Sequence, residues 1–169
     1  VKGSLEQIRK AQELSPTKQQ FVLQEGLTLL NVKQFDLAVE AFKKAYMLEP
    51  KNDTARLFYA VSLIYSGKSD EATKIVENSN VQYDGTLIKA YLDVGRFDAI
   101  EKIAKQRISE NPNDVQLHIS LAALYLKAKR NNDAIREIKI AADIEPRFKA
   151  QADEYIKMIQ SGKDPSQAK

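Results

Sequence analysis

The stretch FDLAVEAFKKAYMLEP, residues 35–50, decides the fold because versions of it return along the chain. FDAIEKIAKQRISENP covers residues 97–112 and NNDAIREIKIAADIEP covers residues 131–146. A shorter version, SDEATKIVENSN, covers residues 69–80. Apolar residues recur three or four apart in each copy, which is typical of an amphipathic helix. The chain is therefore a repeat protein built from helices.

The spacing of the copies sets the length of the repeat. The sequence separation is 34 from Ala38 to Ala72, 28 from Ala72 to Ile100, and again 34 from Ile100 to Ala134. The separation between Pro112 and its counterpart in the last copy is also 34. The pattern predicts four repeats, of which the third has lost six residues.

Each repeat carries signals for two helices that pack closely together. Small residues allow close approach of the helix axes; they are Gly26, Ala60 and Ala122 on first helices and Ala38, Ala72 and Ala134 on second helices. Large side chains fill the space between the helices; they are Leu29, Phe42, Leu63, Val76, Tyr91, Tyr125 and Ile138. Prolines at 50, 112 and 146 end second helices. Either Asn52 or Asp53, and either Asn113 or Asp114, is the N-cap candidate of the next helix, and Ser15-Pro16 is the same entry signal for the first pair.

We expect the following organisation. A leading helix occupies residues 1–15, repeats fill 16–148, a capping helix covers 148–160, and a disordered tail follows at 161–169. The repeats span about 16–50, 53–80, 84–112 and 114–146. The helices within them are expected at 16–31, 35–48, 53–66, 69–79, 84–94, 97–110, 114–128 and 131–144. Gly67 and Gly95 lie where a left-handed residue would end a first helix.

Composition argues against catalysis. The 169 residues include one His and no Cys, so thiol nucleophiles, paired histidines and cysteine-based metal sites are excluded. No catalytic, cofactor-binding or metal-binding residue is predicted. The net charge of +3 comes from interleaved acidic and basic residues and gives no reason to expect a nucleic-acid partner. The sequence also lacks an apolar run long enough to span a bilayer.

With its period of 34, the chain resembles the tetratricopeptide-repeat family over roughly residues 19–148. The resemblance implies an all-α, right-handed superhelix of about four helix pairs that binds a protein or peptide on its concave face. First helices line that face. By register it should carry Gln20, Leu23, Gln24, Leu27, Asn31, Leu57, Val61, Tyr65, Lys89, Asp93, His118, Ile119 and Lys127.

Several interpretations of these surfaces stay open. The apolar part of the groove either binds a partner or receives Leu5, Ile8 and Leu14 of the leading helix. His118 is either a packing residue or a ligand contact.

Some family members grip a peptide carboxylate with Lys and Asn, but the matching places here hold Leu23, Leu27 and Val61. A basic cluster is either a solvated face or a site for anionic polymer; its members are Lys102, Lys105, Arg107, Lys127, Lys129, Arg130, Arg136 and Lys139.

A narrower resemblance rests on LSPTKQ at 14–19, AALY at 122–125 and FKAQADEYI at 148–156. These stretches are similar to the C-terminal repeat region of bacterial O-antigen ligase and polymerase membrane proteins. The resemblance implies an extracytoplasmic accessory domain whose catalytic membrane portion precedes Val1. A homodimer formed through the end helices is a further expectation.

Overall fold

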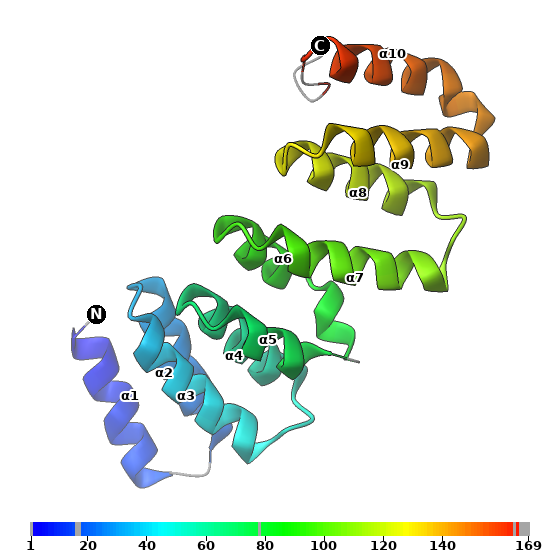
Figure 1. The fold of residues 1–169 in the computed structure, drawn as a ribbon. Helices are drawn as coiled ribbons and strands as arrows, with labels where there is room; N and C mark the ends of the chain where they lie inside the picture. Colours follow the sequence, from blue (N-terminus) through cyan, green and yellow to red (C-terminus); the bar gives the residue numbers. More distant parts are fainter. Residues whose placement is uncertain (1, 16–17, 78, 164, 166–169) are drawn as a thin grey trace. The chain divides into compact units, whose positions relative to one another are not determined.

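The computed structural model describes residues 2–15, 18–77, 79–163 and 165. Throughout this described part the regular secondary structure is helical. The chain divides into two compact units, Val1–Arg96 and Phe97–Lys169. Figure 1 shows the order of the helices along the chain. The all-helical, tetratricopeptide-like fold class predicted from the sequence is confirmed by these helices and by the structural likenesses given below.

The first unit contains two complete helix pairs and single helices on either side. Its elements are α1 (Lys2–Leu14), α2 (Gln19–Asn31), α3 (Phe35–Leu48), α4 (Asp53–Tyr65), α5 (Ser69–Val76), a 3-10 turn η1 (Asn80–Tyr83) and α6 (Gly85–Asp93). α2 packs against α3, and α4 packs against α5. The first helices of successive pairs also touch, because α4 contacts both α2 and α6.

The second unit contains one complete pair between two further helices. Its elements are α7 (Phe97–Glu110), α8 (Val115–Lys127), α9 (Asn131–Ile144), a 3-10 turn η2 (Pro146–Phe148) and α10 (Lys149–Gln160). α8 packs against α7 and α9, and α10 packs against α9. The two helices of the predicted third repeat, α6 and α7, belong to different units.

The sequence located the second helices more accurately than the other elements. α3, α7 and α9 have the predicted bounds, and each is 14 residues long. Of the two candidates for each N-cap, the structure selects Asn52, which accepts a hydrogen bond from the Ala55 amide, and Asp114, which accepts from the Gln116 amide. Ser15-Pro16 was predicted to open the next helix, but Pro16 lies outside the described residues.

The six residues missing from the third repeat are lost around the junction before it, where both α5 and α6 are shorter than their counterparts α3 and α4. α5 has 8 residues where α3, α7 and α9 have 14. The η1 turn follows, and its Val81 is only 7% exposed. α6 has 9 residues, which agrees with the short helix expected there. The sequence had extended α5 to residue 79, three residues past its end at Val76.

The leading helix α1 occupies the register of a second helix. It ends at Leu14, and α3 ends one repeat period later, at Leu48. It packs against α2 in the same way that α3 packs against α4. Leu14, one of the three residues expected to fill the groove, is 86% exposed. Of the predicted disordered tail, residues 161–163 and 165 are described, and Pro165 is buried.

Small residues at the predicted positions allow the helices to touch. Ala38, Ala60 and Ala72 are fully enclosed, with 0% of their surface exposed. At Gly26 on α2 an added Cβ would lie 2.7 Å from the Phe42 ring of α3, well inside van der Waals contact. Phe42 is itself 0% exposed, so its ring has no free space to move into. The α2 and α3 backbones therefore depend on the absence of a side chain at residue 26.

We expect Gly26→Ala to destabilise the protein by about 1–3 kcal/mol, because overpacking a full core shifts side chains and backbone. Chemical denaturation measures the free energy of unfolding. Gly3→Ala is the control, since an added Cβ there meets nothing within 4 Å. Equal stability of the Gly26→Ala and Gly3→Ala chains would contradict the tight contact.

The turn after each first helix contains a residue with positive φ. These residues are Lys33 (φ 60°), Gly67 (φ 82°), Gly95 (φ 73°) and Lys129 (φ 58°). Their successive separations of 34, 28 and 34 are those of the repeats. In each turn the following amide reaches back to close the helix, as in the hydrogen bond from the Gln34 amide to the Leu29 carbonyl. The glycines were expected there, but the two lysines were not.

Lys33→Gly and Lys129→Gly should each stabilise the protein by about 0.5–1 kcal/mol, because a side chain in the left-handed region carries a steric cost that glycine lacks. Gly67→Ala should have the opposite effect by a similar amount. Thermal and urea denaturation of the three variants check the sign. Destabilisation by Lys33→Gly would show that the lysine side chain stabilises the turn.

Candidate functional site

In the first unit, α2, α4 and α6 form the layer of first helices expected to bind a partner. The exposed side chains that α2 contributes are Gln20, Gln24 and Asn31, whereas Leu23 and Leu27 are half-buried. α4 adds the half-buried Leu57 and Tyr65, and α6 adds the exposed Lys89 and Asp93. These predicted residues lie on helices in mutual contact, because α4 touches both α2 and α6.

Two residues of the predicted surface are enclosed and cannot contact a partner. Val61 is 2% exposed and His118 is 4% exposed. Nδ1 of His118 lies 2.7 Å from Oε2 of Glu137, and Nε2 lies 3.1 Å from the Pro112 carbonyl oxygen. Both ring nitrogens are thus occupied inside the α8–α9 pair. His118 is a packing residue, the first of the two alternatives that the sequence left open.

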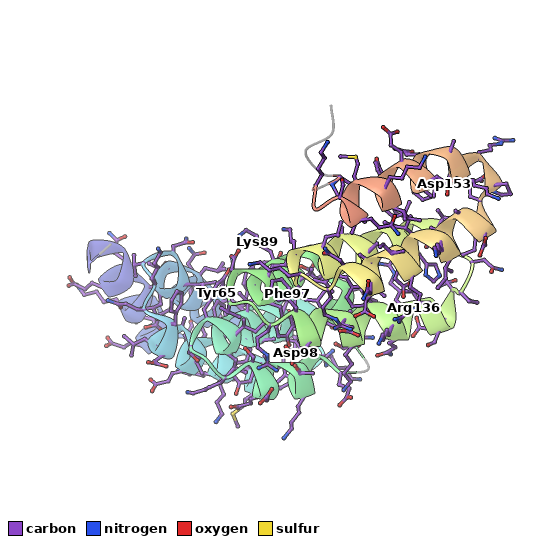
Figure 2. The ribbon with its side chains drawn as sticks, turned by 45° about the horizontal axis from the view of Figure 1, so that its top comes forward. Tyr65, Lys89, Phe97, Asp98, Arg136 and Asp153 are labelled. Carbon is purple, nitrogen blue, oxygen red and sulfur yellow. The ribbon has the colours of Figure 1, made fainter. Side chains whose placement is uncertain are left out.

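Tyr65 links three helices at one end of the layer. Its ring stacks on Phe35 of α3 with centroids 5.2 Å apart, and its hydroxyl donates to Oδ2 of Asp93 on α6 at 2.8 Å. Nζ of Lys89 donates to the same carboxylate oxygen at 2.7 Å. Tyr65 and Lys89 are marked in Figure 2. The sequence predicted Tyr65, Lys89 and Asp93 but missed Phe35, the first residue of a second helix.

The charges of this cluster are fixed at neutral pH. Partial burial, with the hydrogen bond and charge of Asp93, raises the pKa of Tyr65 to about 12, so the hydroxyl keeps its proton. Hydrogen bonds from Lys89 and then Tyr65 hold the pKa of Asp93 below its ordinary value. The cluster is therefore a set of matched donors and acceptors, with no group ready to act as an acid or base.

A hollow of about 560 Å³ opens beside the stacked rings. Its lining comes from the α2–α3 turn, the start of α3 and the end of α4, and includes Lys33, Asp36 and Tyr65. The lysine with positive φ therefore borders the hollow. The charged side chains and the two aromatic rings that line this hollow can bind polar and planar groups of a ligand.

The second unit adds only part of the predicted surface. On α8, Ile119 is half-buried and Lys127 is exposed. Within the described residues no group of three His, Asp or Glu side chains is placed to hold a metal ion. None of the described helices combines the length and the apolar character needed to cross a bilayer.

Part of the basic cluster is neutralised by an ion-pair network around Glu101. Its carboxylate accepts from the Tyr125 hydroxyl at 2.9 Å and pairs with Lys105 at 2.7 Å. Arg130 also pairs with Glu101, and its guanidinium lies 4.5 Å from the centroid of the Tyr125 ring. Asp133 then binds Arg130 at 2.7 Å and Arg136 at 2.8 Å. This face is thereby much less basic than the sequence suggests.

Glu101 is the centre of the network. Partial burial alone would raise the pKa of Glu101, but hydrogen bonds from Lys105, Arg130 and Tyr125 outweigh it and lower the pKa to about 2. The ionised carboxylate therefore stabilises the folded state above its unfolded pKa of about 4.5. That stabilisation is lost as the pH falls from about 4.5 towards 2.

We expect Glu101→Gln to lower the free energy of unfolding at pH 7 by about 1–2 kcal/mol, allowing for solvent screening of the exposed partners. The deficit should shrink as the pH falls through this range, because the unchanged chain then loses the same interaction. Urea denaturation at pH 7 and pH 3 measures both effects. Glu154→Gln on the exposed face of α10 is the control. A deficit of the same size at both pH values would contradict this role.

Comparison with known proteins agrees with the helical repeats predicted from the sequence. Residues 29–85 match the family model described as Tetratricopeptide repeat. This segment extends from the end of α2 through α3, α4 and α5 to the start of α6. This segment, about a third of the chain, is similar to a tetratricopeptide repeat. None of the curated proteins matches the sequence significantly.

Solved structures share the fold at low sequence identity. The crystal structure of MamA protein aligns with a TM-score of 0.58 and 18% identity, covering 88% of this chain and 85% of that chain. MamA 41-end from Desulfovibrio magneticus RS-1 gives a TM-score of 0.56 and 16% identity, covering 85% and 84%. YrrB, described as a TPR protein with an unusual peptide-binding site, gives a TM-score of 0.50 and 15% identity, covering 91% and 82%. These likenesses show a tetratricopeptide-type fold.

The narrower resemblance gains nothing from these comparisons. The family match and the structures above give no support to the O-antigen ligase or polymerase region, or to the bacterial envelope as its location. Of the stretches on which that resemblance rests, AALY lies on α8 and FKAQADEYI on η2 and α10, whereas Pro16 and Thr17 lie outside the described residues.

Proposed function

We propose that this chain is a non-catalytic scaffold module that binds a peptide or a segment of a partner protein. The binding surface is the first-helix layer of the first unit. Its members are Gln20, Leu23, Gln24, Leu27 and Asn31 on α2, Leu57 and Tyr65 on α4, and Lys89 and Asp93 on α6. On α8 of the second unit, Ile119 and Lys127 are the corresponding candidates.

One observation carries the proposal, namely the combination of half-buried leucines with exposed amide side chains on touching helices. Leu23, Leu27 and Leu57 keep part of their apolar surface in water. Covering that surface with a partner side chain is favourable by about 25 cal/mol per Å². The neighbouring Gln20, Gln24 and Asn31 can donate to and accept from a peptide backbone. Together these groups suit an extended or helical peptide with apolar anchors.

The structural neighbours agree with this class of function. YrrB is described as a protein with a peptide-binding site, and it shares the fold of this chain. Leu23, Leu27 and Val61 stand where other family members carry the Lys and Asn that grip a peptide carboxylate. We therefore expect recognition of internal peptide segments rather than of a free C-terminus.

Selection from a random peptide display library with the full chain, followed by calorimetric titration of the selected peptides, tests the proposal. Leu23→Ser combined with Leu57→Ser should weaken binding about tenfold or more, since two partly desolvated apolar contacts are lost. Leu48→Ser on α3, whose side chain is 41% exposed, is the matched control and should leave the affinity unchanged.

Recovery of no peptide above background would count against the proposal. So would equal affinity of the Leu23→Ser, Leu57→Ser chain and the unchanged chain for every selected peptide. Far-UV circular dichroism and thermal denaturation confirm that both variants are folded before the titrations are compared.

A further inference from the structure

The outer face of α3 carries an exposed stripe that the proposed peptide-binding surface does not use. Its residues are Leu37, Glu40, Lys44 and Met47, spaced by three, four and three positions. This spacing places them on one side of the helix in the pattern of a coiled-coil seam. Leu37 is 45% exposed and Met47 is 70% exposed. Glu40 and Lys44 are also exposed, and no ion pair joins them in the described part of the chain.

The other repeats show that the fold does not require apolar residues at the ends of this stripe. Leu37 corresponds to Glu71, Ala99 and Asp133 in the later second helices. Met47 corresponds to Ser109 in α7 and Asp143 in α9. The same helix is therefore built elsewhere with polar or small residues in these places. Because large exposed apolar side chains on a water-facing helix bring no benefit to folding, the stripe on α3 indicates an interaction surface.

The order of residues along the stripe is complementary to itself when reversed. If a second α3 lies antiparallel across it, Leu37 faces Met47 of the other copy and Glu40 faces Lys44 of the other copy. Two-fold symmetry then repeats both contacts, which gives two apolar contacts and two ion pairs. A parallel arrangement would instead place each charge opposite the same charge. An unrelated partner has no reason to match a pattern whose reversed order is complementary to itself.

We propose that the outer face of α3 is a self-association site at which a second copy of this chain docks its own α3 in antiparallel orientation. A hollow of about 430 Å³ along this face receives the apolar side chains of the other copy. It is lined by Glu40, Lys43, Lys44, Met47 and Leu48. The dimer leaves the first helices α2, α4 and α6 free, so it does not depend on the peptide-binding proposal.

The small contact area that α3 offers limits the expected affinity of the dimer. α3 has 14 residues, and a helix of that length is about 20 Å long. One helix face is small beside the area of a standard protein interface. The dimer is therefore weak and concentration-dependent, with dissociation in the range of roughly 10–500 µM at low salt.

Sedimentation equilibrium of the full chain from roughly 10 µM to 1 mM measures self-association. Variants in which the charges of Glu40 and Lys44 are reversed test the site. Glu40→Lys alone and Lys44→Glu alone each set like charges opposite one another twice, and each should weaken self-association roughly tenfold. The double variant Glu40→Lys, Lys44→Glu restores opposite charges and should dimerise within about threefold of the unchanged chain. An equimolar mixture of the two single variants should form a heterodimer more readily than either forms a homodimer.

Lys74→Glu is the matched control, because Lys74 on α5 occupies the position that Glu40 occupies on α3 and is also exposed. It should leave self-association unchanged. A chain that stays monomeric up to about 1 mM overturns the proposal. Dimers that are equally strong in the single variants overturn it too, as does a double variant that associates as weakly as the singles.

Discussion

Close contact between helices at small residues is the constraint on which the rest of this structure depends. A first helix and a second helix meet where Gly26 faces Phe42, and there is no room even for a methyl group. Ala38, Ala60 and Ala72 meet the same demand elsewhere, with no surface exposed. Because each helix pair buries only part of its apolar surface by itself, the remainder must be covered by the next pair. This requirement explains why the sequence repeats with a regular period.

Polar contacts repeat with the same register as the apolar ones. The Tyr91 hydroxyl lies 2.9 Å from that of Thr73, and the Tyr125 hydroxyl donates to Glu101 at 2.9 Å. The two tyrosines are one full repeat period apart, and their partners occupy the same position of successive second helices. The two contacts span 18 and 24 residues, so the six residues lost around the junction of α5 and α6 lie inside the shorter one. The deletion therefore shortens the loop and preserves the contact.

Sequence reasoning succeeded where one residue type can satisfy the local geometry and failed where several can. The caps Asn52 and Asp114 were predicted to within one residue, because few side chains accept from a helix N-terminus. Lys33 and Lys129 were missed because the left-handed turn tolerates lysine at some cost, although the glycines at the equivalent positions were a usable signal. For His118 the register indicated the first-helix surface and left packing as the alternative, because periodicity locates a helix face but does not reveal the buried carboxylate of Glu137.

Comparison of equivalent positions in the repeats also separates the residues that the fold needs from those that it does not need. Residues that every copy needs, such as the alanines at the helix contacts, report on folding. Leu37 and Met47 on α3 have polar or small counterparts in the later second helices, whereas Leu23 and Leu27 on α2 correspond to the apolar Leu57 and Val61 on α4. Leu23 and Leu27 therefore lie on a first helix of the first unit, and Leu37 and Met47 lie on a second helix. The proposed peptide-binding surface and the proposed self-association face thus use different helices, and they approach each other where Tyr65 and Leu37 line the same hollow.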